Sequence, residues 1–210
     1  AAISLGVLSY LVILSGGIAG NGLRGASYQL LRDIVVQNGS HTIVLGNIVR
    51  TGLTGPYITV KSGATLTLKL TDANSILAGS SSDPIIKVES GAKLNIVNAA
   101  GNIYPSLSVL NSSGPAISGG GTVNVTDCIL YARGGSSSAG ISTPLTIEEG
   151  GCVDVDLMTG KLTMNGGSLT GQLIQNVTYS GTGGNLQLTN AEPPAVKGEN
   201  GTPLYKVELT

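Results

Sequence analysis

A pattern that recurs along the chain constrains its fold more than any other feature. Each copy reads apolar-x-apolar, two polar residues, Gly, a small residue, one further residue, and apolar-x-apolar again. Alternation with a period of two is typical of β-strands, and a corner glycine accepts the positive φ that a tight turn needs. Each copy therefore predicts two short strands joined at a sharp corner. Full copies span residues 58–68, 86–96 and 145–155, and shorter ones span 117–125 and 162–169.

The spacing of the copies predicts how they assemble. Copies that begin at Ile58, Ile86, Ile117 and Leu145 start 28, 31 and 28 residues apart. This length suits one coil of a parallel β-solenoid with three short strands, because a single coil cannot bury its inward side chains and must stack on another. A β-sandwich or jelly roll whose hairpins share turn chemistry is the alternative. The corner glycines expected at positive φ are Gly63, Gly91 and Gly150.

Aligning the copies also predicts which side chains stack on one another. Neighbouring strands lie about 4.8 Å apart, so equivalent residues of successive coils form columns. On the outside, we expect Lys61 to pair with Glu89 of the next coil. The expected inward columns are Ile58/Ile86/Ile117/Leu145, Val60/Val88/Ile147, Leu66/Leu94/Val123/Val153 and Leu68/Ile96/Val125/Val155, and the expected outward column is Thr67/Asn95/Asn124/Asp154.

The composition agrees with narrow layers repeated many times. The 210 residues include no Phe, no Trp and 32 Gly, so Val, Ile and Leu must fill the core. Hydrophobic residues make up 41%, charged residues 11%, and the net charge is -1. These values exclude the low hydropathy and high charge of disordered chains and the basic face of nucleic-acid binders. So few charges also leave little electrostatic repulsion to oppose self-association.

The segment from Gly119 to Ile141 combines several motifs in a fixed order. It holds a Gly run, a Thr-Val-x-Val strand, a second apolar stretch, Gly-Gly, and an Ala-Gly-Ile restart. In this order it resembles the Gly-rich β-helix repeats of bacterial cell-surface and adhesin proteins. The resemblance covers about residues 56 to 190 and implies a right-handed parallel β-helix on an extracellular structure. It implies no catalytic residues, because the family pattern has none to carry over.

The first 23 residues carry no charge, and we interpret the opening Ala1 as the start of a mature product. The alternation changes phase after Leu8, which predicts a strand with a bulge; a pilin-like helix is the alternative. An exposed apolar strand is unfavourable, so it either folds back on its own body or inserts into a neighbour as a donor strand. We expect the second. The expected polymerisation contacts are Ile3, Leu5, Val7, Leu8, Tyr10, Val12 and Leu14.

Local patterns predict the remaining organisation. Residues 26–36 place Leu30, Leu31, Ile34 and Val35 on one helical face, which predicts a short amphipathic helix capping the first coil. A polar segment with several prolines precedes a terminal alternating stretch. The predicted divisions are an apolar connector at 1–23, a capping helix and turn at 24–40, a solenoid body at 41–190, a linker at 191–203 and a C-terminal strand at 204–210.

Few residues suggest chemistry. His41 is the only histidine, which argues against His-based triads and His-rich zinc sites. Five acids come closest to the clusters used by carbohydrate-cleaving β-helices, and we interpret them as solvated acids on a strand and at a turn. We therefore predict no enzyme activity, no catalytic residue, no metal and no cofactor. The five acids are Asp127, Glu148, Glu149, Asp154 and Asp156.

Two further sets of residues bear on covalent modification. Cys128 and Cys152 are the only cysteines. Pairing is the expectation for a secreted protein, and two buried thiols are the alternative. Asparagines in N-x-Ser/Thr triplets mark candidate glycosylation sites. The five triplets begin at Asn38, Asn111, Asn124, Asn176 and Asn200, and Pro203 directly after the last one argues against Asn200, which leaves Asn38, Asn111, Asn124 and Asn176 as the candidates.

These expectations converge on one function and two alternatives. We expect a secreted structural subunit that polymerises head to tail with copies of itself into an extracellular filament at the cell surface. The first alternative is a glycan-binding or adhesive module of a surface protein, with Tyr57, Tyr104 or Tyr131 on an outer face. The second is a filament subunit whose N-terminus is a pilin-like helix. No nucleic-acid partner is expected.

Overall fold

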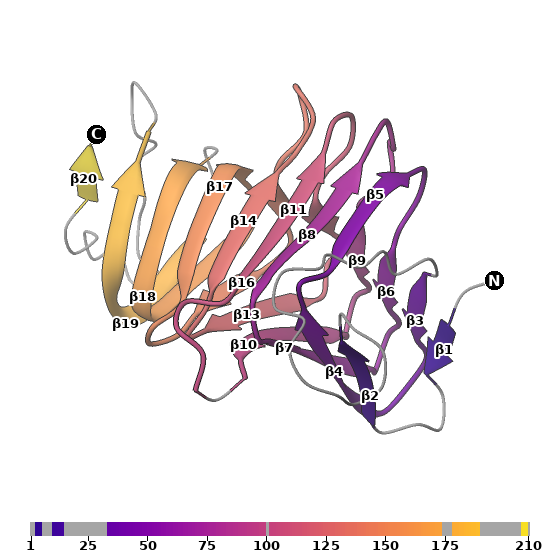
Figure 1. Cartoon of the computed structure of the whole chain (residues 1–210). Helices are drawn as coiled ribbons and strands as arrows, with labels where there is room; N and C mark the ends of the chain where they lie inside the picture. The colour runs from indigo at the N-terminus through magenta and orange to yellow at the C-terminus, as the bar shows by residue number, and fades with distance from the viewer. Residues whose placement is uncertain are drawn as a thin grey trace.

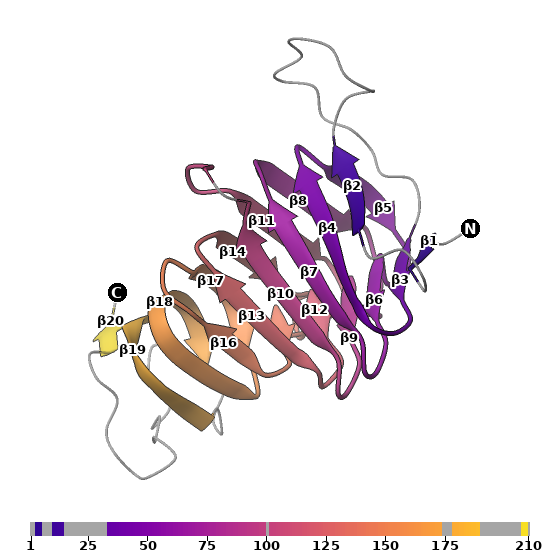
Figure 2. The same ribbon diagram turned by 90° about the horizontal axis from the view of Figure 1, so that it is seen from below.

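The computed structural model describes residues 3–5, 10–14, 33–99, 101–173, 178–189 and 207–209. Within these ranges every helix or strand element is a strand, and all pairings between named strands are parallel. Figures 1 and 2 show the chain advancing as a stack of coils from one end to the other. Parallel pairing excludes, for the described strands, the hairpins of a β-sandwich, and it agrees with the predicted β-solenoid.

Each complete coil contributes one strand to each of three faces, which we call A, B and C. Face A holds β1 (Ile3–Leu5), β3 (Ile34–Val36), β6 (Ile58–Val60), β9 (Ile86–Val88), β12 (Ile117–Ser118) and β15 (Ile141–Ser142). Face B holds β2 (Tyr10–Leu14), β4 (Ser40–Gly46), β7 (Thr65–Leu70), β10 (Lys93–Asn98), β13 (Thr122–Thr126) and β16 (Leu145–Ile147). Face C holds β5 (Val49–Leu53), β8 (Ala73–Ala78), β11 (Ser106–Asn111), β14 (Ile129–Arg133), β17 (Cys152–Met158) and β20 (Val207–Leu209).

Two long strands complete the stack. β18 (Lys161–Leu173) and β19 (Thr178–Leu188) each run through a corner, so that their first parts belong to face B and their later parts to face C. The coils shorten here. Lys61 and Glu89, which face each other on successive coils, are 28 residues apart, whereas Thr163 and Ser180 are only 17 apart.

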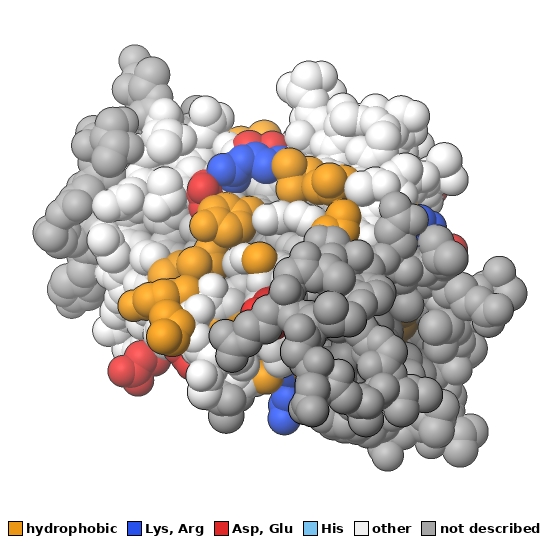
Figure 3. All heavy atoms as spheres, viewed as in Figure 1, with side chains coloured by type: hydrophobic (Ala, Val, Ile, Leu, Met, Phe, Trp, Pro, Cys, Tyr) orange, Lys and Arg blue, Asp and Glu red, His pale blue; other side chains and the backbone are white. Residues whose placement is uncertain are grey.

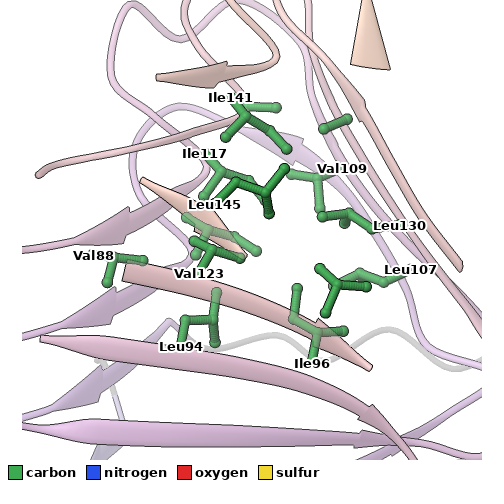
Figure 4. Close-up of a cluster of buried hydrophobic side chains, with 14 of the residues drawn as sticks. Val88, Leu94, Ile96, Leu107, Val109, Ile117, Val123, Leu130, Ile141 and Leu145 are labelled. Atoms are coloured by element: carbon green, nitrogen blue, oxygen red, sulfur yellow. The ribbon is translucent and has the colours of Figure 1, made fainter. Parts of the chain in front are cut away.

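The inward side chains of the three faces form one continuous apolar core. In Figure 4, Leu94 and Ile96 of face B point toward Leu107 of face C and Ile117 of face A, and all four are fully buried. Aliphatic side chains suffice for this interior, because three short strands enclose a space only a few side chains wide. The absence of Phe and Trp is explained in this way.

The predicted columns are confirmed for the first three copies. Ile58, Ile86 and Ile117 stack on face A. Leu66, Leu94 and Val123 stack on face B, as do Leu68, Ile96 and Val125 beside them, and Val60 stacks on Val88. The corner glycines Gly63, Gly91 and Gly150 have φ of 77°, 79° and 72°, as predicted.

The fourth copy is displaced by one face, so its predicted columns are wrong. Leu145 and Ile147 stack on Val123 and Val125 of face B, and Val153 and Val155 stack on Leu130 and Ala132 of face C. Ile141 occupies the face A position expected for Leu145, and Asp154 lies beside Tyr131 instead of Asn124. The cause is that a strand, a polar-Gly corner and another strand serve equally well at any corner of a three-sided coil.

The predicted helix at 26–36 is wrong at its end, where Ile34–Val36 form β3. Ile34 and Val36 are fully buried while Val35 between them is half-buried, which is the period of a strand. Ladder pairing with β6 and inward stacking on Ile58 and Val60 therefore override the helical spacing of the leucines. Residues 26–32 lie outside the described residues.

The N-terminal segment holds two strands on two faces where one bulged strand was expected. β1 pairs with β3 on face A, and β2 pairs with β4 on face B. Ile3–Leu5 and Tyr10–Leu14 are therefore strands, not the helix of the alternative interpretation. The change of phase in the sequence falls at residues 6–9, between the two strands and outside the described residues.

Candidate functional site

The two ends of the solenoid are the surfaces on which the assembly hypothesis depends. At one end, β1 and β2 are the outermost described strands of faces A and B, and β5 is the outermost described strand of face C. At the other end, β20 lies beyond β19 on face C. Figures 1 and 2 place β1 and β20 at opposite extremes of the stack. Among the described strands, β1, β2, β5 and β20 each have a pairing partner on one side only.

Five of the seven expected polymerisation contacts lie in the two N-terminal strands. Val7 and Leu8 lie outside the described residues. The strands themselves pair with their own chain, so in this structure the N-terminal segment forms the first coil of its own body. The five residues in β1 and β2 are Ile3, Leu5, Tyr10, Val12 and Leu14.

The hydrogen bonds of β5 to β8 show which backbone groups of β5 face the other way. The Ser75 N–H donates to the carbonyl of Ile48 at 2.7 Å, and Val49 and Arg50 lie opposite Ser75 and Ile76. Along a strand, successive residues direct their N–H and C=O groups to opposite sides. The groups of Val49 therefore point away from β8, toward the end of the solenoid.

Two buried polar groups near this end have no hydrogen-bond partner among the described residues. Arg50 Nε and the Tyr57 hydroxyl are both buried and unbonded. The guanidinium carbon of Arg50 lies 5.8 Å from the centre of the Tyr57 ring, and Arg50 Nη1 donates to the Thr51 carbonyl at 3.3 Å. Burial raises the pKa of Tyr57, so its hydroxyl stays protonated and able to donate. Unsatisfied buried groups are rare in native proteins and call for an explanation.

The outward column of face B carries a ladder of amide side chains. Asn124 Nδ2 donates to Asn95 Oδ1 at 2.9 Å, and Asn95 Nδ2 donates to Thr67 Oγ1 at 3.3 Å. This column was predicted, and only its fourth member differs. A glycan on Asn124 would replace one amide hydrogen and leave the other for Asn95, so the ladder and glycosylation are compatible.

The other glycosylation candidates differ sharply in their surroundings. Asn38 is exposed, and Asn176 lies outside the described residues. Asn111 is 3% exposed, and its Nδ2 donates to the carbonyls of Asp83 at 2.9 Å and Pro115 at 3.0 Å. Both amide hydrogens are used inside the fold, so the folded chain disfavours a glycan at Asn111. Glycosylation of Asn38 and Asn124 stays a prediction.

The two cysteines are both free thiols in this structure. Cys152 lies opposite Ile129, one position away from Cys128, and its N–H donates to the Cys128 carbonyl. Their side chains therefore leave the sheet in opposite directions. Cys128 points inward with its Sγ 3.4 Å from the Ile96 carbonyl, and burial raises the pKa of its thiol to about 12.

The acids singled out in the sequence are engaged in local contacts. Asp154 pairs with Arg133 at 2.9 Å, and Asp156 accepts the Gly134 N–H at 2.7 Å. Around the neighbouring corners, Glu148 accepts from the Asn165 amide, Asp127 accepts from the Asn98 amide, and the Glu149 carbonyl accepts the Asp127 N–H. Across the described parts of the chain, no three metal-ligating side chains group together.

Exposed aromatic and aliphatic side chains gather near face C. Tyr104 is 78% exposed and Ile103 is 87% exposed in the loop before β11, and Tyr131 of β14 is 36% exposed. Figure 3 shows hydrophobic side chains across this side of the molecule. Tyr57, the third tyrosine proposed for an outer face, is fully buried, so that expectation is wrong. Tyr57 lies just before β6, and its side chain is buried in the interior beside Arg50.

Neither the search for a membrane-spanning helix nor the comparisons with known proteins gave a match. Among the described residues, no helix has the length and apolar character needed to cross a membrane. No protein-family model, curated protein or solved structure matches the chain.

Proposed function

We propose that this chain is a secreted structural subunit that polymerises head to tail into an extracellular filament through its N-terminal strands. The observation that carries the proposal is the position of β1 and β2 as the outermost described strands of faces A and B. All pairings between the named strands that the structure describes run parallel, so the end of one copy matches the beginning of the next in direction. A contact between two different ends of this kind repeats without closing and generates a filament.

The composition supports the same proposal. The connector at 1–23 is uncharged, and only 11% of all residues are charged, so copies repel one another weakly. In the insertion that we propose, β1 and β2 add to the neighbouring copy as donor strands, and their apolar residues make the contact. The low charge and the open edges then serve one purpose, which is contact between identical chains.

Deletion of residues 1–20 tests the proposal. The shortened chain should stay a soluble monomer with the far-UV spectrum of a β protein, while the full chain forms filaments visible by negative-stain electron microscopy. Two full-length variants sharpen the test. Leu5→Asp, opposite the fully buried Val36, should block assembly, and Ser4→Asp adds the same charge opposite the half-buried Val35 and should permit it. Filaments that persist after the deletion would overturn the proposal.

The hand of the coil belongs to the same proposal. We propose right-handed winding, because connections between parallel strands of one sheet are right-handed in nearly all proteins. A density map of the filament at side-chain resolution would test the hand directly, and left-handed coils would contradict it.

A second candidate function rests on the exposed side chains near face C. Tyr104 has a φ of 50°, an uncommon conformation outside glycine, and the loop holds its ring in solvent. Tyr104 and Tyr131 offer ring faces of the kind that stack on sugars, and Asp154, which pairs with Arg133, lies opposite Tyr131 as a polar partner. A glycan-array signal abolished by Tyr131→Ala or Tyr104→Ala would favour an adhesive module. Signals unchanged by both variants would exclude these rings as the binding site.

A further inference from the structure

Charged side chains are divided unequally between the two edges of face B. Where face B passes into face C, the connections carry carboxylates, and their described residues include no Lys or Arg. We call this edge the acidic corner. Its acids adjoin along the stack, since the Asp127 N–H donates to the Glu149 carbonyl at 3.2 Å. They are Asp72 after β7, Asp127 after β13, and Glu148 and Glu149 after β16.

Positive charge gathers at the other edge, where face A passes into face B, and we call this edge the lysine corner. Lys87 lies on β9 of face A, and Lys93 and Lys161 begin the face B strands β10 and β18. Lys87 and Lys93 are exposed, and Lys61 donates to Glu89 at 2.7 Å. The described residues thus place four lysines and one carboxylate at this corner.

The acidic corner also carries an exposed apolar pair. Ile103 and Tyr104, in the connection from β10 to β11, are the most exposed large hydrophobic side chains among the described residues. Residues 101–105 project beyond the neighbouring coils (Figure 1). Asn98 holds them to the body, because its Nδ2 donates to the Asn102 carbonyl and to Asp127 Oδ2, both at 3.0 Å. Apolar side chains held in solvent and bordered by polar groups are typical of a contact surface.

The lysine corner has the complementary properties. Its turns consist mostly of small residues at 62–64, 90–92 and 119–121, and a Cβ added at Gly63 would meet nothing within 4 Å. A corner of small residues bordered by lysines therefore accepts a projecting apolar loop bordered by carboxylates, in shape and in charge. Lys69 lies on face B between the two corners and belongs to neither.

We propose that filaments of this chain associate side by side, with the acidic corner of one copy against the lysine corner of a copy in the neighbouring filament. This inference rests on the proposed head-to-tail polymer and names the surface through which such polymers bundle. The two corners are different surfaces, so each contact leaves one corner of each kind open, and filaments in the same orientation add without closing. Because every subunit repeats the contact, a weak pairing between two copies becomes a strong one between two filaments.

Charge reversal tests the pairing, with the fraction of filaments that lie side by side in negative-stain images at low salt as the readout. One variant combines Lys87→Glu with Lys93→Glu, and the other combines Asp72→Lys with Glu149→Lys. Each variant alone should give single filaments. Mixing the two preformed filaments should restore pairs, because the first keeps its acidic corner and the second keeps its lysine corner.

A matched control changes the net charge equally at another place. Asp33→Lys with Asp83→Lys alters two exposed acids that precede the face A strands β3 and β9, away from both corners, and these filaments should bundle as the unmodified ones do. Unmodified filaments that stay single at low salt, or a mixture that restores no pairs, would overturn this inference and leave the proposed polymer intact. If the unmodified chain forms no filaments at all, the proposed polymer fails and the inference fails with it.

The apolar loop and the salt concentration give two further readouts. Ile103→Ser with Tyr104→Asn should separate the filaments at low salt, and asparagine accepts the φ of 50° that Tyr104 adopts. Leu110→Ser, at an exposed position of face C outside the acidic corner, should leave them together. Raising the salt from about 0.01 M to about 1 M shortens the screening length from about 30 Å to about 3 Å and should lower the bundled fraction roughly tenfold. Bundles that survive both the loop variant and high salt would count against this contact.

Discussion

Two glycine-to-alanine variants separate the two reasons for which this solenoid uses glycine. At Gly121, between β12 and β13, φ lies outside the positive range, but a Cβ would come within 2.5 Å of Val88 Cγ1, 2.6 Å of the Glu89 carbonyl oxygen and 2.8 Å of the Ala92 carbonyl oxygen. At Gly63 the φ is 77°, and a Cβ would meet nothing within 4 Å. The first glycine lets two coils approach, and the second lets the chain turn.

The structure sets the size of each effect. Ordinary contact begins at 3.4 Å, so Gly121→Ala must move the preceding coil by roughly 0.6–0.9 Å, which also lengthens the 2.9 Å bond from the Gly121 N–H to the Val88 carbonyl. Overpacking of about 2 kcal/mol and a weakened hydrogen bond of about 1 kcal/mol together give a loss of about 3 kcal/mol. Gly63→Ala incurs only the left-handed backbone penalty, about 1 kcal/mol.

Urea unfolding followed by far-UV circular dichroism measures both losses, provided that the slope m is the same for all variants. Asparagine adds a matched control, since it tolerates the left-handed conformation better than alanine does. Gly63→Asn should therefore recover part of the loss, and Gly121→Asn should recover none. Equal losses for the two alanine variants, or recovery by asparagine at Gly121, would refute the division of roles.

Three further predictions concern single side chains. Asn111→Asp should lower the free energy of unfolding by about 3 kcal/mol at neutral pH, because a buried carboxylate would face two carbonyls; in urea titrations this loss should shrink on acidification. Glu89→Gln should lower the free energy of unfolding by under about 1 kcal/mol at pH 7. Because the bond from Lys61 lowers the pKa of Glu89, the difference in stability between the variant and the unmodified chain should vanish as the pH falls through that lowered pKa. A difference that persists in acid would contradict the ion pair. Iodoacetamide should label Cys152 and spare Cys128, which is 2% exposed with its pKa raised to about 12 by burial; equal labelling in peptide mass spectrometry would contradict this placement.

The sequence predicts the body of the solenoid well where consecutive copies share a coil length. Ile58 and Ile86 repeat with the corner glycine five residues later in each copy, so a gap-free alignment also gives the true register. The Lys61–Glu89 pair, at 2.7 Å, follows from the same alignment. Periodicity in sequence is converted directly into neighbours in space as long as the number of residues per coil stays the same.

The same reasoning fails where the coil length changes. Leu145 begins a copy that matches in residue types, yet the coil before it is shorter, and the copy falls on the next face. No local signal distinguishes one corner of a three-sided coil from another. The burial of Arg50 and Tyr57 could not be predicted either, and here the reason is different. Their burial depends on the end of the stack, which the repeat pattern does not encode.

The shortening of the coils gives the folding of this chain a direction. Forming a coil requires closing the loop that separates stacked residues, and that loop spans 28 residues between Lys61 and Glu89 but 17 between Thr163 and Ser180. Loop-closure entropy makes the shorter closure more favourable by about 0.4 kcal/mol for each coil. Chains with more local contacts also fold faster. The solenoid should therefore nucleate around β18 and β19 and grow toward the N-terminus. In pulse-labelling hydrogen exchange, the amides of β18 and β19 should be protected before those of β7 and β10. In such an order β1 and β2, through which we propose that copies assemble, are the last strands to pair with the body.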